Sequence, residues 1–297
     1  MARRLTLAVT PGMDGRTVDS LLRKELGLSG TLVKRAKWLE DGILLDGKPV
    51  AVNVKAAAGQ ELSVVVEDAG NGVVVPSEGP VDVVYEDEDI LVVNKAPGVS
   101  VHPGPGHWDD TLGNFILGRY RAQGSDAGFH PVHRLDKGTS GLIVIAKHPH
   151  AQEKLKQQLH TGAFRRVYLA VCDGIPQPSQ GVVDAPIGRA DGSILRREVR
   201  PDGLEARTRY ETLETANGRA LLRLTLDTGR THQIRVHMTH LGYPLTGDFL
   251  YGTENQELIS RPALHSAELE IKHPVTGEGI RLRCELPEDM RKLIINI

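Results

Sequence analysis

Pro131–Ala146 reads PVHRLDKGTSGLIVIA, a polar loop with one carboxylate followed by an unbroken apolar run. The run over 142–146 has the length of a strand and contains no polar residue, which predicts a central strand of a sheet, buried on both faces. Gly138 and Gly141 allow the backbone before this strand to turn tightly and to approach a ligand closely. The stretch therefore predicts a core strand that carries Asp136 in the loop leading into it.

Further strands and helices are expected on both sides of this stretch. Apolar runs and alternation predict strands over 83–85, 90–93 and 222–226. Apolar residues at helical spacing predict three helices, one capped by Asp110 and starting at Thr111, one over 151–159, and one capped by Thr231. Strands outnumber helices and do not alternate strictly with them. We therefore expect an α+β fold with a mixed, mainly antiparallel sheet.

Residues 1–70 have the pattern of a separate small domain. Apolar residues at helical spacing predict a first helix that Gly27 stops, and a second one capped by Ser29 or Thr31. Asp46-Gly47 is a strong hairpin signal, and a strand over 62–66 follows. The residues after it, 69–80, are rich in Gly and Pro. The expected organisation is a domain over 1–70, a linker over 71–80 and a larger domain over 81–297.

Composition limits the class of protein. The chain has 297 residues and a formal net charge of only −2, so any nucleic-acid surface must be a local patch of positive charge. The two cysteines, Cys172 and Cys284, lie far apart in the sequence and lack metal-ligand spacing, which is typical of a reducing compartment. Neither a secretory signal nor an apolar membrane span is evident. We expect a soluble, cytoplasmic monomer that needs no cofactor.

Taken alone, Asp136 has two readings. Arg134 and Lys137 flank it and would favour its ionised form if they come close in space, and an ionised carboxylate can act as a nucleophile or base. The alternative is a turn in which Asp136 caps the backbone and Arg134 pairs with a surface acid.

Several stretches in a fixed order give the Asp136 loop its context. They read LVVNKAPG at 91–98 with VHPG at 101–104, FRRVYLAV at 164–171, TGRTHQIRVH at 228–237, PALHS at 262–266 and HPVTGE at 273–278. With the 131–146 stretch, this set resembles the RluA-type pseudouridine synthases over nearly the whole chain. RTVDSLL at 16–22 and DGILLDGK at 41–48 resemble an S4-type RNA-binding domain.

The resemblance implies a role for each of nine residues. Asp136 would be the catalytic carboxylate, with Tyr168 against the flipped uracil and Arg235 pairing with Asp136 through a bidentate contact. Three residues would contact the substrate or position the loop: Leu264 lines the uracil pocket, Arg134 enters the space that the uridine vacates, and His133 supports the loop. Three would bind RNA phosphates from the second helix: Lys34, Arg35 and Lys37.

The chemistry of pseudouridine formation agrees with a single carboxylate. The bond from uracil N1 to ribose C1′ breaks, the base turns, and C5 joins C1′, so no water has to be activated. Asp136 could attack the sugar, attack the base or remove a ribose proton, and these alternatives stay open. No metal is expected, because His232, His237 and His240 lack the intervening Glu of a zincin helix and lack a Cys pair.

Other readings compete with this one. The expected substrate is structured RNA, with large-subunit ribosomal RNA as the first choice and transfer RNA as the alternative. A non-catalytic RNA-binding protein of the same fold would be expected to have lost one of the three catalytic candidates. A hydrolase of nucleosides would need a second positioned acid and a water. A basic cluster could touch RNA phosphates or form a solvated loop: Arg189, Arg196, Arg197 and Arg200.

Overall fold

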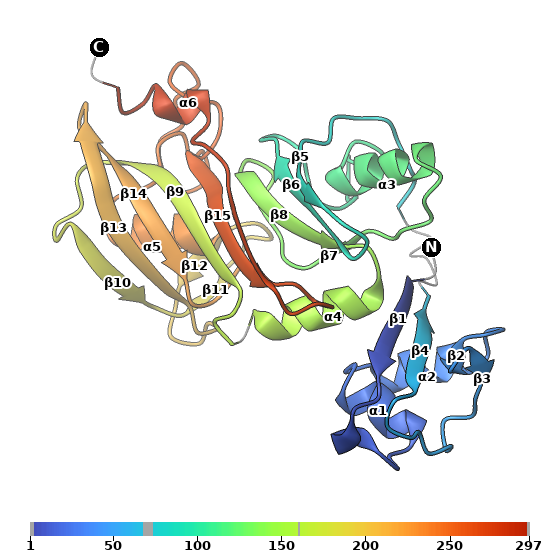
Figure 1. Cartoon of the computed structure of the whole chain (residues 1–297). Coiled ribbons are helices and arrows are strands. Elements are labelled where there is room, and N and C mark those ends of the chain that lie inside the picture. The colour runs from blue at the N-terminus through green and yellow to red at the C-terminus, as the bar shows by residue number, and fades with distance from the viewer. Residues whose placement is uncertain (1–2, 68–73, 160, 296–297) are drawn as a thin grey trace.

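The computed structural model describes residues 3–67, 74–159 and 161–295 (Figure 1). Its N-terminal part is a small unit with its own sheet, in which the strands run in the order β1-β4-β2-β3 and all pairs are antiparallel. The elements of this unit are β1 (Arg3–Ala8), a 3₁₀ turn (Pro11–Met13), α1 (Val18–Lys24), α2 (Gly30–Ala36), β2 (Ile43–Leu45), β3 (Lys48–Pro49) and β4 (Glu61–Val66).

Local chemistry explains how these elements begin and turn. The Ser29 hydroxyl accepts a hydrogen bond from the backbone N–H of Leu32 and so caps α2, as the sequence predicts. Asp46 and Gly47 both have positive φ, at 50° and 75°, which is the geometry that a tight two-residue hairpin needs. The 62–66 strand is present as β4. The first strand, β1, was not predicted, and it pairs with β4 along its whole length.

The rest of the chain forms one large sheet with helices on both sides. Its strands run in the order β10-β13-β14-β9-β15-β8-β6-β5, with β16 beside β15 and β7 beside β8. Among the strand pairs of the described residues, only β15–β8 is parallel, so the prediction of a mixed, mainly antiparallel α+β fold is confirmed. The strands are β5 (Val83–Glu86), β6 (Ile90–Lys95), β7 (His130–Pro131), β8 (Ser140–Ala146), β9 (Arg165–Asp173), β10 (Gln180–Asp184), β13 (Arg207–Ala216), β14 (Arg219–Leu226), β15 (Leu264–Lys272) and β16 (Gly279–Arg283).

Smaller elements complete this part of the molecule. A separate two-stranded sheet pairs β11 (Ile187–Arg189) with β12 (Arg197–Val199). The helices are α3 (Leu112–Ala122), α4 (Pro149–Gln158), α5 (Gln233–His240) and α6 (Glu288–Arg291). Among the described residues, none of the helices has the length and apolarity that crossing a membrane requires.

The central strand β8 shows why its sequence is apolar throughout. Every residue of β8 is buried, and its side chains alternate between two cores. Ile143 and Ile145 pack in the core that includes α3 and α5, whereas Leu142 and Val144 pack in the core that includes α4. A strand with helices on both faces has no polar side, which is what the unbroken run predicted.

The loop before β8 is fixed by the close approach of β8 and β15. Gly141 has φ of 109°, and a Cβ at this position would lie 2.3 Å from the backbone oxygen of Ser266. The Ser140 hydroxyl is hydrogen-bonded to the His265 ring at 2.9 Å, which joins the same two strands through side chains. A larger residue at 141 would push β15 away. Glycine is therefore required where the Asp136 loop enters the sheet.

The N-terminal unit meets the larger part through ion pairs. The Arg3 guanidinium donates to Asp89 at 2.8 Å and pairs with Glu88 at 2.7 Å. Asp89 is buried and also pairs with the His148 ring at 3.0 Å, where α4 begins. The hydrophobic core of the N-terminal unit contains only residues before 67, so the two parts are packed separately (Figure 1). The domain limits at 70 and 80 remain a prediction, and residues 68–73 of the expected linker lie outside the described residues.

Two predicted helix starts are each wrong by one residue. The helix expected from Thr111 begins at Leu112, with Thr111 itself as the N-cap in a capping box with Asn114, so Asp110 is not the cap. The helix expected after Thr231 begins at Gln233, and its N-cap is His232 in the left-handed conformation without a side-chain cap. Thr111 thus takes the capping role that the sequence assigned to Asp110, whereas the N-cap of α5 lies one residue after Thr231 and makes no side-chain hydrogen bond.

Candidate active site

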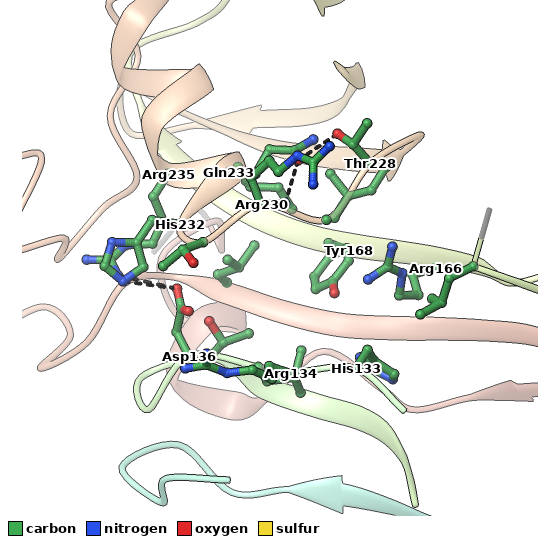
Figure 2. A pocket seen from close by; sticks show the side chains of 18 of the residues that line it. His133, Arg134, Asp136, Arg166, Tyr168, Thr228, Arg230, His232, Gln233 and Arg235 are labelled. Atoms are coloured by element: carbon green, nitrogen blue, oxygen red, sulfur yellow. Dashed lines mark hydrogen bonds and ion pairs between the residues drawn. The ribbon is translucent and has the colours of Figure 1, made fainter. Parts of the chain in front are cut away.

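Asp136 lies at a cavity of about 490 Å³ between the β8 loop, β9 and the start of α5. Its carboxylate is 3.4 Å from the guanidinium of Arg235 and 3.8 Å from the His232 ring. Figure 2 shows these side chains pointing toward one another across the cavity. The side chain of Asp136 is partly exposed, so a ligand in the cavity can reach it. The structure therefore brings the predicted carboxylate and arginine together.

The main partner of Arg235 is not Asp136. Its Nε and Nη2 both donate to the carboxylate of Asp248, at 2.7 Å each, and Asp248 is 0% exposed. The bidentate contact that was expected between Arg235 and Asp136 is therefore made with Asp248, and only Nη1 reaches Asp136. Burial alone would lower the pKa of Arg235, but the hydrogen bonds and charge of Asp248 outweigh it and raise the pKa. Arg235 thus stays protonated and keeps its orientation.

A second brace holds His232 beside the same carboxylate. His232 has φ of 58°, which is uncommon for a residue with a side chain. Its Nδ1 is hydrogen-bonded to the hydroxyl of Tyr251 at 2.8 Å, and that hydroxyl also accepts from the backbone N–H of Arg197. Burial lowers the pKa of His232 while the charge of Asp136 opposes this. The strained backbone is therefore held in place by contacts around the cavity.

The loop that carries Asp136 is also held by the buried side chain of Lys95. The ammonium group of Lys95 donates to the backbone oxygens of Val99 and Lys137, at 2.8 and 3.2 Å. Burial lowers its pKa to about 7, and the charge of Asp136 acts in the opposite direction. Arg261 reaches the same loop from another side, because it donates to the oxygens of Gly138 and Leu264. These contacts fix the backbone directly after Asp136.

Tyr168 and Leu264 contribute to the apolar lining of the cavity. Both are buried, Tyr168 on β9 and Leu264 at the start of β15. Burial raises the pKa of Tyr168, with Arg166 acting in the opposite direction and the charge of Asp136 adding to the rise. The phenol is therefore neutral around pH 7. Arg166 lies two residues before it on the same strand, and its buried Nε has no hydrogen-bond partner within the described part of the chain.

His133 and Arg134 have different surroundings, although they are adjacent. His133 is buried, its Nε2 accepts from the backbone N–H of Val144, and its ring packs edge-on against Phe164. Burial lowers its pKa to about 3, so the ring is neutral. Arg134 is exposed at the cavity (Figure 2). The structure thus gives His133 contacts that support the loop and leaves Arg134 accessible.

The cavity has a positive lining. Four arginines line it, against two carboxylates. The second carboxylate, Asp227, is exposed and pairs with Arg209 at 3.0 Å. The arginines are Arg134, Arg166, Arg230 and Arg235. Positive charge therefore gathers here although the chain as a whole has a net charge of −2.

Other predicted residues lie away from the cavity. Lys34, Arg35 and Lys37 are exposed on and just after α2 of the N-terminal unit. In the basic cluster, Arg200 is paired with Asp191 and Asp202. The other members of that cluster do not share one role: the Arg196 guanidinium lies over the Tyr251 ring, and the Arg197 backbone N–H bonds the same residue.

The sequence did not identify Asp248, Tyr251 or Lys95 as parts of this site. Asp248 and Tyr251 lie in a loop after α5 with no strong periodic signal, and they become recognisable only through their contacts with Arg235 and His232. Lys95 was part of a motif that resembled the family, but nothing in the motif shows that its ammonium group is buried. A buried lysine in an apolar strand is the one signal that could have drawn attention to it.

Known proteins resemble this chain in both sequence and structure. A family model described as RNA pseudouridylate synthase matches residues 89–240. YjbO of Bacillus subtilis, described as an uncharacterized RNA pseudouridine synthase, is 41% identical over 91% of this chain and 95% of the relative. Ribosomal large subunit pseudouridine synthase D of Xanthomonas campestris pv. campestris is 39% identical over 98% of this chain and 92% of the relative.

Solved structures show the same resemblance. Human RNA Pseudouridylate Synthase Domain Containing 4 aligns with a TM-score of 0.58 and 27% identity, and covers 71% of this chain and 90% of that one. Human RNA Pseudouridylate Synthase Domain Containing 1 gives the same TM-score and identity, and covers 69% of this chain and 83% of that one.

Proposed function

The chain belongs to the RNA pseudouridylate synthase family and is an RNA pseudouridine synthase, and from this premise we propose that it modifies large-subunit ribosomal RNA. The relative from Xanthomonas and one from Pseudomonas aeruginosa, 38% identical over 87% of this chain, are both named ribosomal large subunit pseudouridine synthase D. Transfer RNA is the alternative that the experiment below distinguishes.

The observation that carries the proposal is the Asp136 carboxylate at a cavity whose other charges are mainly positive. Isomerisation moves a uracil from one carbon–nitrogen bond to a carbon–carbon bond on the same sugar, so it needs one reactive carboxylate and no activated water. Asp136 meets this requirement. The second carboxylate of the cavity, Asp227, pairs with an arginine and is exposed, which does not favour a hydrolase with two acids.

We assign the reactive role to Asp136 and supporting roles to Arg235 and Tyr168. Arg235 places a positive charge 3.4 Å from the carboxylate, which favours its ionised form. Tyr168 offers a buried ring against which a uracil can pack, and its neutral phenol can donate or accept a hydrogen bond. Leu264 completes the apolar wall.

The uridine has to leave its helix or loop to reach Asp136. Extruding a base from a stack costs a few kcal/mol, and an inserted side chain can offset part of that cost. Arg134 is exposed at the cavity two residues before Asp136, so we propose that its guanidinium occupies the vacated space.

We also propose that the N-terminal unit binds RNA in the manner of an S4-type domain. Lys34, Arg35 and Lys37 lie exposed within one short segment, and among the described residues none of the three forms an ion pair within 4.0 Å. Cations that have no partner in the protein are available for phosphates. This unit would then anchor the RNA while the larger part carries out the reaction.

The experiment that tests the proposed function is tritium release from RNA labelled at uracil C5. Unmodified large-subunit ribosomal RNA and transfer RNA are offered separately to the wild type and to Asp136→Asn. We expect release from the ribosomal RNA with the wild type only. RNA binding by Asp136→Asn should stay within about threefold of the wild type, because the carboxylate is replaced by a carboxamide of nearly the same shape.

The possible outcomes separate the parts of the proposal. Release from transfer RNA alone would reject the ribosomal target and keep the chemistry. Release by Asp136→Asn at the wild-type rate would remove Asp136 from its role. If Asp136→Asn binds RNA more than about tenfold more weakly than the wild type, the carboxylate contributes to holding the RNA. The loss of activity in this variant would then say nothing about the reaction.

A further inference from the structure

Three aromatic side chains of this chain stand out by their exposure. The protein has only 2 Trp, 4 Phe and 6 Tyr, and most of them are buried or partly buried. Trp38, Trp108 and Phe249 are 82%, 67% and 62% exposed. Trp38 lies in the N-terminal unit beside Lys37, whereas Trp108 and Phe249 both lie next to residues that contact the Asp136 loop. Aromatic rings left in water beside a positive cavity need a partner to explain them.

Trp108 is connected to the Asp136 loop through its neighbour His107. The Nε2 atom of His107 lies 2.9 Å from the ammonium group of Lys137, which directly follows Asp136. His107 Nδ1 is 2.7 Å from Asp110, so the carboxylate orients the ring and Nε2 can accept from Lys137. The backbone oxygen of Trp108 accepts from the side chain of Asn114. The backbone that carries the indole is thus held at Trp108 itself and through the preceding residue, His107.

Phe249 is connected to Asp136 through Arg235. It directly follows Asp248, the residue that holds Arg235 in place. The Arg235 guanidinium carbon lies 5.9 Å from the centre of the Phe249 ring, and the same guanidinium reaches Asp136. The high exposure of the ring shows that the guanidinium covers only part of it. Phe249 therefore presents an open aromatic face beside Arg235, which lines the cavity.

We propose that Phe249 and Trp108 are stacking platforms for unpaired bases that flank the target uridine in the RNA. This inference rests on the proposed function, because it requires that an RNA strand enters the cavity at Asp136. Every base has a flat π face, and stacking on an aromatic side chain contributes to binding without requiring a particular sequence. The uridine taken into the cavity leaves its neighbours unstacked, and exposed rings at the margin can replace the stacking that those neighbours lose.

The surroundings of the two rings favour RNA over a protein partner. A protein interface has a contiguous apolar centre, whereas each of these rings stands singly among charged groups. His107, which directly precedes Trp108, contacts the ammonium group of Lys137, and the Arg235 guanidinium lies over the Phe249 ring. Cations next to isolated aromatic rings are the arrangement that binds single-stranded nucleic acid. Asp109 and Asp110 adjoin Trp108, and Asp110 is held by His107, so the base is expected to approach from the Lys137 side.

Tryptophan fluorescence tests the proposal directly, because the chain has only two tryptophans. The combination Trp38→Phe with Asp136→Asn leaves Trp108 as the single fluorophore in a protein that cannot turn over. Adding Trp108→Phe and Phe249→Trp moves the single fluorophore to position 249. Each protein is titrated with the unmodified large-subunit ribosomal RNA, with transfer RNA and with a fully paired RNA duplex. Filter binding supplies the binding curve independently.

We expect quenching of both reporters that saturates together with filter binding to whichever RNA is modified, and no quenching by the duplex at equal occupancy. In proteins that retain Asp136, Trp108→Leu and Phe249→Leu should each raise KM about tenfold with little change in kcat, since the lost contact is one stacked base. Trp108→Phe and Phe249→Trp keep a ring and should restore KM. Leu213→Ala, at an exposed apolar residue of β13, is the control for a change of surface.

Failure of the inference and failure of the proposed function give different results. Normal tritium release with unquenched reporters and unchanged KM in both leucine variants would overturn the stacking proposal and keep the enzyme. A fall in kcat of Phe249→Leu without a rise in KM would mean that this ring only supports Arg235. Absence of tritium release from both RNAs would reject the proposed function, and the fluorescence titrations, which need no turnover, would still decide whether the rings contact RNA.

Discussion

Arg235 stands between two carboxylates of different character. It is bound through two hydrogen bonds to Asp248, which is fully buried, and through one longer contact to Asp136, which is partly exposed. The two hydrogen bonds to buried Asp248 keep the guanidinium in one position even if the Asp136 side chain moves. Its charge is therefore available to Asp136 at a fixed point, and fixed charges of this kind stabilise a reacting group without rearranging during the reaction.

Replacing Asp248 should affect both stability and rate. Asp248→Asn leaves the buried guanidinium of Arg235 without its counter-charge, and breaking such a pair on one side costs about 3–5 kcal/mol of stability. Arg235 is then free to shift, and a displacement of about 1 Å at a reacting centre can lower kcat about a hundredfold. Urea unfolding and tritium release measure the two effects. Asp191→Asn, at an acid that is 92% exposed and pairs with Arg200, is the matched control and should change neither by much.

The outcome at this position separates two roles for Asp248. Lower stability together with wild-type kcat would mean that Arg235 does not need its exact place for the reaction, and Asp248 would then be structural only. Wild-type stability would contradict the burial argument itself.

The sequence predicts the two charged side chains at the centre of the candidate site better than it predicts the residues that hold them. Asp136 and Arg235 lie in strings long enough to resemble a family, and the structure brings them within 3.4 Å. Asp248 was missed because its role depends on burial and on the direction of a guanidinium, neither of which a motif records. For the same reason the bidentate contact was assigned to the wrong acid.

At the scale of elements, α2 and its C-terminal neighbour present a compact basic surface. Lys34, Arg35 and Lys37 are exposed there, on the outer side of a helix whose inner side packs Leu32 and Val33 in the core of the N-terminal unit. Because α2 is fixed by that core and by its Ser29 cap, the three cations keep a constant spacing. A fixed group of cations can match the phosphates of a folded RNA without first having to be ordered.

Removing this basic surface should weaken RNA binding and reduce its dependence on salt. Each phosphate contact releases counterions. In a plot of the logarithm of the binding constant against the logarithm of the salt concentration, each lost contact reduces the slope by about 0.7–0.9. The change Lys34→Ala, Arg35→Ala and Lys37→Ala together should therefore reduce the slope by about 2 to 3. Filter binding at several salt concentrations measures it. An unaltered slope would show that α2 does not touch the RNA.

A control with the same loss of charge separates contact from net charge. Lys24, Lys48 and Lys55 are exposed elsewhere on the N-terminal unit. Their joint replacement by alanine changes the net charge equally, and we expect a much smaller change of slope.

Elements with strong local signals could be predicted, and elements defined by their partners could not. The Asp46-Gly47 hairpin and the all-apolar β8 have sequences that determine their conformation locally. The strand β1 begins with Arg3 and Arg4, which read as a charged terminus, and it becomes a strand because β4 offers it a full edge. Its ion pairs with Asp89 and Glu88 likewise depend on residues that are distant in the sequence.

At the scale of the whole molecule, buried histidines make stability depend on pH. Burial lowers the pKa of His133 to about 3, and those of His150 and His265 to about 4, from an ordinary value of 6.5. Below pH 6.5 the unfolded chain binds protons that the folded chain does not. The contribution of these rings is therefore complete above pH 6.5 and is lost progressively as the pH falls toward 4.

The expected loss is about 1.4 kcal/mol per pH unit for each ring once the pH is well below 6.5, or about 4 kcal/mol per unit for three. Urea unfolding between pH 7.5 and 5 measures it. Asp89 does not contribute in this window. Burial would raise its pKa, but hydrogen bonds from His148 and Arg3 outweigh burial and lower it, so its contribution to stability is lost only below the ordinary carboxyl range. His150→Gln should remove about a third of the slope, and a flat profile in the wild type would contradict the assignment.

The pairing of β8 with β15 has a consequence for the order in which the parts of the molecule fold during synthesis. The Asp136 loop leads into Ser140 and Gly141 of β8. These two residues pair with His265 and Ser266 of β15, which lie near the other end of the chain. The N-terminal unit packs its own core from residues before 67, so it can fold while the remainder is still being synthesised. A nascent chain that has not yet extended past Leu264 lacks both the strand beside Gly141 and one wall of the cavity. The translating ribosome therefore releases a basic, folded N-terminal unit well before it releases a finished catalytic pocket.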